Sequence, residues 1–270
     1  MVYNYTQKEL ITMKLKEIAE LIERFAPTSL AYGWDNVGLL VGSPEKEINR
    51  ILAALDTNLS AVCEAIENKC DAIISHHPVF FGGIKRIDYS SNDGKLAELL
   101  IKNDIAVYAA HTNMDTAEHG INAVLAEIFG LSDVKILEYH TESTSAGLGR
   151  YGILSTPVTF GELCNITKEK LHTPCVRAAG DFEKNIKTLC VASGSCSESI
   201  ETALRKGCDA VITGDMKYHE MIDYFEKGIC VIDAGHYPTE FIVTDIFADI
   251  LKDTDLEIIK SKQKDIFNFV

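Results

Sequence analysis

Four of the eight histidines in this 270-residue chain stand where an apolar run of the sequence ends. A lone histidine at a strand end is usually structural, but this concentration favours a metal site. Imidazole and carboxylate ligands suit Zn, Fe, Mn, Co or Ni and argue against an Fe–S cluster or a cysteine-rich zinc site. The runs end in Ser-His-His-Pro (75–78), Ala-His-Thr-Asn-Met-Asp (110–115), Thr-Gly-Asp (213–215) and Gly-His-Tyr-Pro-Thr-Glu (235–240).

The spacing of these side chains indicates how they converge. Neighbouring strand residues face opposite sides of a sheet, so His76 and His77 can meet only where their strand has ended. In the His-x-x-x-acid pairs at 111–115 and 236–240, the two side chains share a face if a helical turn begins there. The set exceeds what one tetrahedral ion requires and suits two ions bridged by a carboxylate. Glu240 has the longer reach for that bridging role.

The elements that must position these residues follow from the alternation of the sequence. Short β-branched runs alternate with amphipathic helical stretches, which is typical of an α/β fold with a largely parallel sheet. Ligands bind at the carboxyl ends of such strands, so we expect the histidine-bearing ends to lie together. The expected strands are 51–55, 71–75 and 105–110, and the expected helices are 60–68, 95–102, 120–129 and 7–25, the last ended by Pro27.

The second half of the sequence repeats the pattern of the first. Residues 51–77 align without a gap on 189–215, and Cys-Asp-Ala-Ile-Ile-Ser matches Cys-Asp-Ala-Val-Ile-Thr within this stretch. Residues 106–115 align on 231–240, each with a histidine followed four residues later by an acid. Similarity among all strand–helix–strand units is the alternative explanation, but the matched His-x-x-x-acid pairs favour an internal duplication.

The repeat also predicts the domain organisation. We expect a first α/β half at 1–136, a connecting segment at 137–185, and a second half at 186–270 that duplicates 51–130. The connecting segment carries a Gly-rich turn and lacks the length to bury a core alone. The expected fold class is therefore α/β, with duplicated units in mixed, largely parallel sheets and two halves that meet at a shared metal site.

The composition of the chain indicates which binding partners and which cellular compartment to expect. The net charge of −14 and the lack of a basic run argue against nucleic acid as a partner. No run of about 18 apolar residues is present, and the charged amphipathic start lacks the apolar core of a signal peptide. Eight cysteines without a Cys-x-x-Cys pair, in a chain this long, are typical of free thiols. We therefore expect a cytoplasmic protein with no membrane partner.

In the order of its motifs, the sequence resembles the GTP cyclohydrolase I type 2 homologs, also called the Nif-three-like dinuclear metal-centre hexameric proteins. The resemblance implies an α/β duplication, a toroidal homohexamer and two divalent transition-metal ions per subunit. The chain is close to the short form of the family and lacks the large inserted domain of longer members. The matching motifs span nearly the whole chain and are Trp34–Gly42, Ser75–Pro78, Ala110–Asp115, Gly147–Gly152, Thr213–His219 and Gly235–Glu240.

The family pattern also implies roles for single residues. His111 would stand close to the ions, either to orient a ligand or as the catalytic acid and base. The implied metal ligands are His77 and Asp115 for one ion and His76 and His236 for the other, with Glu240 as the bridge.

Cations near these motifs are candidates to bind a substrate phosphate. Lys85 and Arg86 follow the strand end that carries His77, and Lys217 follows the Thr-Gly-Asp motif. Arg150, in the Gly-rich stretch, is a weaker candidate. Solvated surface charge is the alternative for Lys85, Arg86 and Lys217.

Two further features lie near strand ends of the second half. Asp215 aligns with His77 in the repeat and is a possible ligand, although the family pattern does not make it one. Ser-Gly-Ser at 193–195 superficially suggests a nucleophile, but a helix cap is the better interpretation because no general base is fixed beside it.

The function predicted from these observations is that of a dinuclear-metal-binding protein, and more specifically of a metal-dependent hydrolase. Its substrate would be a small phosphorylated molecule or a purine nucleotide, as the family name suggests, with His111 carrying the proton. The alternative is a non-catalytic metal-binding hexamer that stores or delivers metal, or acts as a protein-interaction or regulatory factor. Both functions need the metal ligands, but storage does not need His111.

Overall fold

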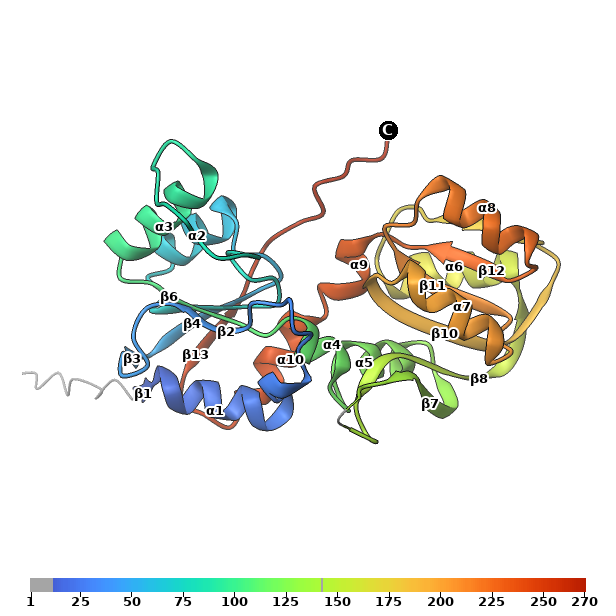
Figure 1. Ribbon diagram of the computed structural model, residues 1–270, viewed down its shortest axis with the longest axis horizontal. Coiled ribbons are helices and arrows are strands. Elements are labelled where there is room, and N and C mark those ends of the chain that lie inside the picture. The colour runs from blue at the N-terminus through green and yellow to red at the C-terminus, as the bar shows by residue number, and fades with distance from the viewer. Residues whose placement is uncertain (1–11, 142) are drawn as a thin grey trace, which may run out of the picture.

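The computed structural model describes residues 12–141 and 143–270, which form two lobes, each built on its own β-sheet (Figure 1). The strands of the first sheet are β2 (Gly38–Val41), β4 (Arg50–Ala54), β5 (Ala72–Ser75), β6 (Ala106–Ala109) and β13 (Glu257–Lys260). Those of the second sheet are β7 (Leu131–Tyr139), β8 (Gly147–Thr159), β9 (Arg177–Ala179), β10 (Asn185–Ser195), β11 (Ala210–Gly214) and β12 (Cys230–Asp233).

Both sheets are mixed. The first has the order β13-β4-β5-β6-β2, in which only the β2–β6 pair is antiparallel. The second has the order β7-β8-β10-β11-β12-β9, and its parallel centre is β10, β11 and β12. The pairs β7–β8, β8–β10 and β12–β9 are antiparallel. These sheets confirm the predicted α/β fold class.

Helices connect the parallel strands and cover the sheets (Figure 1). Residues 7–11 of the helix expected at 7–25 lie outside the described residues, and the helix itself begins at Leu15 and ends at Phe25, two residues before Pro27. Within the described ranges, no helix combines the length and the apolar character needed to cross a membrane. The helices are α1 (Leu15–Phe25), α2 (Leu59–Glu67), α3 (Asn92–Lys102), α4 (Thr112–Thr116), α5 (Ile121–Ile128), α6 (Phe160–Lys170), α7 (Ile200–Arg205), α8 (Tyr218–Glu226), α9 (His236–Glu240) and α10 (Val243–Ile250). Short 3-10 turns lie at Thr28–Leu30 and Ser197–Ser199, and β1 (Met13–Lys14) pairs with β3 (Glu47–Ile48).

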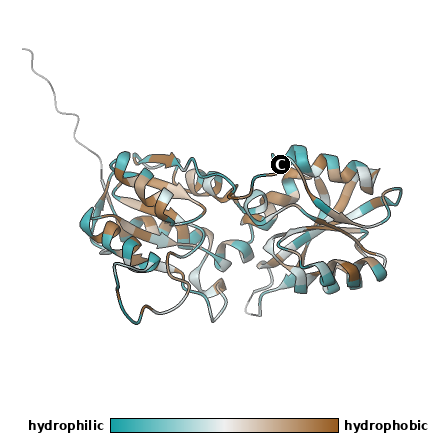
Figure 2. Ribbon diagram, turned by 90° about the horizontal axis from the view of Figure 1, so that it is seen from above, coloured by the Kyte–Doolittle hydropathy of each residue, from teal (hydrophilic) through white to brown (hydrophobic). Residues whose placement is uncertain are grey.

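One buried apolar cluster spans both lobes, and each lobe has a further cluster of its own. Apolar residues concentrate along the strands and on the inward faces of the helices (Figure 2). A continuous buried cluster runs from Ile74 of β5 through Met114 of α4 and Ile121 of α5 to Ile212 of β11. Because interiors are close-packed, this shared core holds the strand ends of the two sheets at a fixed separation.

An aspartate makes the same hydrogen bonds at the start of β5 and of β11. Asp71 Oδ2 accepts hydrogen bonds from the backbone N–H groups of residues 49–50, at 2.8 and 2.9 Å. Asp209 Oδ2 accepts equivalent bonds from residues 187–188, at 2.9 and 2.8 Å. The Cys-Asp-Ala block shared by the two halves of the sequence therefore has a structural cause: its carboxylate ties the starts of two neighbouring strands together.

The two repeats differ by one residue where the strands end. Backbone hydrogen bonds make Ala110, which follows β6, equivalent to Ala234, which follows β12. His111 therefore corresponds to Gly235, and the alignment of His111 on His236 is wrong by one residue. Gly235 has a φ of +90°, a conformation in which a histidine would be strained, so the second histidine lies one position later.

The segment 137–185 is more than a connection. It contains β8, α6 and β9, and the Gly-rich stretch 147–152 lies inside β8 rather than in a turn. A Cβ on Gly147 would lie 2.1 Å from the backbone oxygen of Glu138, so the glycine permits close pairing of β7 and β8. At the other end of the chain, β13 pairs with β4 in the first sheet. The sheets therefore do not follow the boundaries expected at 137 and 186.

Candidate metal centre

The histidines and acids singled out in the sequence lie together between the two lobes. His76 and His77 directly follow β5. After β6, His111 immediately precedes α4 and Asp115 lies within this helix. After β12, helix α9 begins at His236 and ends at Glu240. Among the described residues, three groups of ligand atoms lie within 4.8 Å of one another: His76, His77 and His111; His77, His236 and Glu240; and His76, Asp115 and Glu240.

Two of these groups share Glu240. In the two-histidine subsite, Glu240 Oε2 lies 3.0 Å from His77 Nε2 and 2.8 Å from His236 Nε2. The two nitrogens lie 3.3 Å apart. In the one-histidine subsite, His76 Nε2 lies 3.7 Å from Glu240 Oε2 and 3.7 Å from Asp115 Oδ1. A carboxylate common to both subsites is the ligand arrangement that a bridged pair of ions requires.

Two polar atoms at the centre of the cluster are buried and have no contact with hydrogen-bond geometry among the described residues. In the described part of the chain, His76 Nε2 and Glu240 Oε2 have no hydrogen-bond partner, and the two residues are 0% and 4% exposed. An unsatisfied buried polar atom costs about 1–3 kcal/mol. A cation between these two atoms would satisfy both, so the residues present fit divalent metal ions.

Each of the four histidines is anchored through Nδ1, so its Nε2 is the nitrogen that could bind a metal ion. Metal-ligating histidines almost always donate their other ring nitrogen to a carboxylate or a backbone carbonyl, which fixes the ring and its tautomer. The Nδ1 partners are the backbone oxygen of Ala110 for His76 (3.0 Å), Asp56 Oδ1 for His77 (2.8 Å), Asp35 Oδ1 for His111 (2.9 Å) and Asp215 Oδ2 for His236 (2.8 Å).

The acids around the two-histidine subsite shift its titration. Burial acts to lower the pKa of His77, but the nearby carboxylates of Asp56 and Glu240 outweigh burial and raise the pKa to about 10. Burial also acts to lower the pKa of His236, but the contacts with Glu240 and Asp215 outweigh burial and raise this pKa to about 9. Burial works to raise the pKa of Glu240, but the facing histidines hold it well below its usual range. Without metal, this subsite therefore holds protons at neutral pH.

The division of the ligands between two ions that the resemblance implies stays a prediction. In the structure, His77 Nε2 lies beside His236 Nε2, and His76 Nε2 lies 3.7 Å from both Asp115 Oδ1 and Glu240 Oε2. Successive residues at a strand end point in different directions. His76, anchored on Ala110, is directed toward α4, and His77 is directed toward α9.

Three aspartates that anchor the histidines were not selected as site residues from the sequence. Asp56 follows β4, so the strand-end rule that selected the histidines would also have selected it. Asp35 lies in the Trp34–Gly42 motif, far from any histidine in the sequence, and no spacing signals its role. Asp215 was considered only as a ligand; its carboxylate instead meets Nδ1 of His236.

The Ser-Gly-Ser segment at 193–195 ends strand β10 and caps none of the described helices. Ser193 Oγ donates a hydrogen bond to Asp115 Oδ1 at 3.1 Å. Gly194 has a φ of +58°, and a Cβ there would lie 2.0 Å from Glu240 Oε1. The segment therefore shapes the space around both carboxylates.

The predicted phosphate-binding cations do not touch the ligand cluster. Lys85 and Arg86 lie in an exposed loop and make no hydrogen bond or ion pair within the described residues. Lys217 precedes α8, and its Nζ lies 3.4 Å from Glu220 Oε1 on the same helix. The phosphate role considered for Arg150 is wrong, because its guanidinium is buried and donates to four backbone oxygens.

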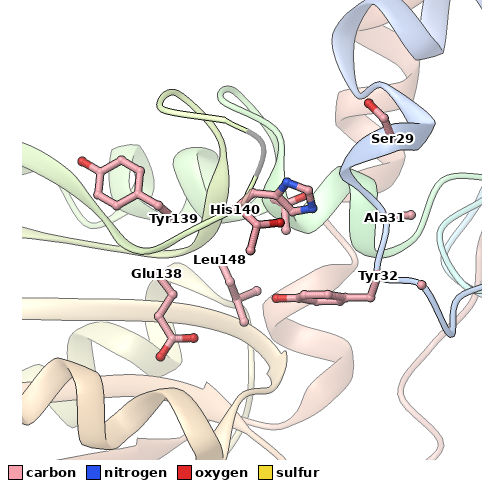
Figure 3. A pocket seen from close by; sticks show the side chains of 10 residues that line it. Ser29, Ala31, Tyr32, Glu138, Tyr139, His140 and Leu148 are labelled. Atoms are coloured by element: carbon pink, nitrogen blue, oxygen red, sulfur yellow. The ribbon is translucent and has the colours of Figure 1, made fainter.

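A pocket of about 360 Å³ is lined in part by Thr116, which follows Asp115 in α4. Tyr32 forms one wall and points toward Leu148 and Glu138 on the other (Figure 3). The ring of Tyr32 also stacks on Trp34, with centroids 6.0 Å apart, and Trp34 lies edge-on to His111 at 6.1 Å. A row of aromatic rings therefore connects the pocket wall to the histidine cluster.

The fold and the cluster define an α/β protein with a histidine–carboxylate site shared by two lobes. The chain belongs to the Duf34/NIF3 (NGG1p interacting factor 3) family, whose model matches residues 13–266. This membership confirms the resemblance seen in the motifs.

Named relatives match most of the chain. It is 40% identical over 232 residues to a GTP cyclohydrolase 1 type 2 homolog of Clostridium acetobutylicum, covering 86% of this chain and 87% of the relative. A protein of the same name from Methanocaldococcus jannaschii is 36% identical over 250 residues, covering 92% and 98%.

Solved structures share the fold. Reduced HcgD from Methanocaldococcus jannaschii superposes with a TM-score of 0.82 at 36% identity, covering 94% of this chain and 100% of that one. A hypothetical protein from Staphylococcus aureus gives a TM-score of 0.89 at 27% identity, covering 96% and 100%.

Proposed function

We propose that this protein binds two divalent transition-metal ions and uses them to hydrolyse a small phosphorylated or purine-nucleotide substrate. The observation that carries the proposal is the convergence of imidazole nitrogens from both lobes on the shared, buried Oε2 atom of Glu240. A mixed nitrogen and oxygen ligand set admits Zn, Fe, Mn, Co and Ni.

His77 and Asp115 would bind one ion and His76 and His236 the other, as the resemblance implies, with Glu240 common to both. Such a pair of ions lowers the pKa of a bound water and stabilises negative charge that develops on the substrate.

We assign proton transfer to His111. Asp35 fixes its Nδ1, and its ring centroid lies 5.0 Å from that of His76 and 5.3 Å from that of His77. An imidazole held in this way can take a proton at Nε2 and return it to the leaving group. Metal storage would not need such a group.

Aromatic side chains beside the cluster support a planar substrate such as a purine. Trp34 is 65% exposed and Phe81 is 58% exposed, and both rings lie edge-on to His111. The relatives named GTP cyclohydrolase 1 type 2 homologs suggest the same class of substrate. Trp34 is the only tryptophan of the chain, so quenching of its fluorescence by guanosine, and not by ribose 5-phosphate, tests this point.

The phosphate of such a substrate would need local cations, because the net charge of −14 repels an anion. Lys85 and Arg86 are free to approach it from their exposed loop, which begins near Phe81. Lys217 could join them after breaking its contact with Glu220. These three roles, and the homohexamer, remain predictions; light scattering after gel filtration tests the hexamer.

The deciding experiment combines metal analysis with turnover. Protein stripped with a chelator and reloaded with Zn²⁺, Mn²⁺, Fe²⁺, Co²⁺ or Ni²⁺ should hold about two ions per chain and hydrolyse GTP or a related nucleotide. Absence of bound metal would contradict the whole proposal. Two bound ions without turnover of any tested nucleotide would favour a non-catalytic metal-binding role.

A further inference from the structure

Two adjacent turns position His236 and its hydrogen-bonding partner. β11 and β12 are neighbouring parallel strands; Asp215 lies in the turn after β11, and His236 follows the turn after β12 (Figure 1). The contact between these residues joins Asp215 Oδ2 to His236 Nδ1 at 2.8 Å. The side chain of Asp215 is 49% exposed, so water can reach its carboxylate. The contact therefore depends on how firmly the two turns are held.

Both turns contain a residue in the left-handed region of backbone conformation. Asp215 has a φ of +55°, and Gly235, which precedes His236, has a φ of +90°. Glycine adopts this conformation freely, whereas for an aspartate it is uncommon and persists only where the surroundings hold it. The turn that carries Asp215 therefore needs support from outside itself.

The carboxylate of Asp233, the last residue of β12, supports both turns at once. Its Oδ1 accepts a hydrogen bond from Gly235 N at 3.0 Å. Its Oδ2 accepts a bond, also at 3.0 Å, from the N–H of Met216, which directly follows Asp215. Asp233 is 4% exposed, so these bonds are shielded from water. One buried carboxylate thus ties the backbone before His236 to the backbone after Asp215.

Arg177 of the neighbouring strand β9 completes this arrangement. It lies opposite Asp233 in the antiparallel β9–β12 pair, and its guanidinium donates to Asp233 Oδ2 and to the backbone oxygen of Met216. Both main-chain groups of Met216 are therefore bound, the N–H by Asp233 and the oxygen by Arg177. The position equivalent to Asp233 in the first lobe is Ala109, whose side chain has no acceptor, so this support belongs to the second lobe.

We propose that Asp233 is a positioning residue: by holding the two turns together, it keeps the carboxylate of Asp215 against His236 Nδ1 and so directs His236 Nε2 toward Glu240. The inference rests on the proposed metal binding, but it does not depend on how the ligands divide between the ions. Residues that orient a metal-ligating histidine typically contribute about 10–100-fold to metal affinity. Asp233 acts one contact further away, so we expect the lower end of this range.

The test is Asp233→Asn, which preserves the shape of the side chain. An amide has one acceptor oxygen in place of two, and Gly235 N and Met216 N bind different oxygens, so one turn loses its bond. Zn²⁺ binding, followed by competition with a chromophoric chelator, should be about 10-fold weaker than in wild type. The matched control is Asp209→Asn, whose Zn²⁺ affinity should equal that of wild type. Asp209 also accepts from two backbone N–H groups of this sheet, but at the strand ends away from the site.

A readout in the metal-free protein separates positioning from a general loss of stability. In wild type, the Nδ1 proton of His236 should give a downfield NMR signal, because it is hydrogen-bonded to Asp215. This signal should shift upfield or broaden in Asp233→Asn and stay unchanged in Asp209→Asn. Should Asp233→Asn fail to fold, Arg177→Met removes the guanidinium from a side chain that is 63% exposed, and we expect the same changes at smaller amplitude.

An unchanged His236 signal or an unchanged Zn²⁺ affinity in Asp233→Asn would overturn the proposal, as would an equal weakening of Zn²⁺ binding in Asp209→Asn. Wild-type protein that binds no Zn²⁺ would instead contradict the proposed function, and the His236 signal would still test the positioning. The two failures are therefore distinguishable.

Discussion

Glu240 occupies space that exists because Gly194 has no side chain: a Cβ on Gly194 would lie 2.0 Å from Glu240 Oε1. The same Cβ would lie 3.3 Å from His236 Cε1. Gly194 belongs to β10 and Glu240 to α9, so the carboxylate common to both subsites is shaped by a neighbouring strand as well as by its own helix.

Gly194→Ala should therefore empty both subsites while the protein stays folded. Metal analysis after dialysis measures the loss. Gly207→Ala is the matched control, because Gly207 has a φ of +78° but open space at its Cβ position. Both substitutions carry the strain of a left-handed alanine, about 1–2 kcal/mol. Equal metal contents in the two variants would show that the collision with Glu240 is unimportant.

Glu240→Ala should remove both ions, whereas Asp115→Ala should remove only the ion that Asp115 binds. The reason is that Glu240 contributes an oxygen to each subsite and Asp115 to one. Elemental analysis of the two proteins checks the difference, with the exposed Glu226→Ala as the control. Full metal retention by the Glu240 variant would rule out its bridging role.

His111→Ala should keep the metal content of wild type and lower turnover by about 10²–10⁴-fold, the usual contribution of a general acid or base. Asp35→Asn should lower turnover in the same direction, because Asp35 fixes the ring of His111. The exposed His119→Ala serves as the control. A fall in metal content would instead make His111 a ligand, and unchanged turnover would disprove the proton-transfer role.

Metal binding at pH 7 should release protons. The pKa values of about 10 for His77 and about 9 for His236 mean that both rings are protonated in the metal-free protein at this pH. Ligation needs the neutral nitrogen, so affinity should rise with pH and level off above about pH 10. Calorimetry in buffers with different ionisation heats measures the release. Asp56→Asn should reduce it, since Asp56 helps to raise the pKa of His77; heats that do not depend on the buffer would contradict the prediction.

Asp71→Ala and Asp209→Ala should each destabilise the protein by about 2–3 kcal/mol, because each leaves two backbone N–H groups without a charged acceptor. Urea unfolding measures this loss, with the exposed Asp253→Ala as control. Metal content should be unchanged. A loss of metal at native stability would contradict a purely structural role for these aspartates.

The strand ends that carry the site could be predicted because their signals are local. The apolar runs before His76 and before His111 form the short strands β5 and β6 of the first sheet, as expected. The Gly-rich stretch 147–152 is expected as a turn, because glycines interrupt the alternation that identifies a strand, but it lies within β8.

Contacts between distant segments carried no such signal. Asp35 meets His111 across 76 positions of the chain, and Gln263 meets Leu55 across 208. The pairing of His77 with His236 depends on how the two lobes pack, and no spacing in the sequence reveals it.

Asp71 and His76 lie just beyond opposite ends of β5, and Asp209 and Asp215 lie just beyond opposite ends of β11. Each strand is thus tied to its neighbour by aspartate hydrogen bonds at one end and followed by a residue of the candidate metal centre at the other. This division of labour separates the residues that secure the architecture from those that face the ions. Residues at the site end of these strands can therefore be substituted, in evolution or by design, without loss of the aspartate hydrogen bonds at the other end.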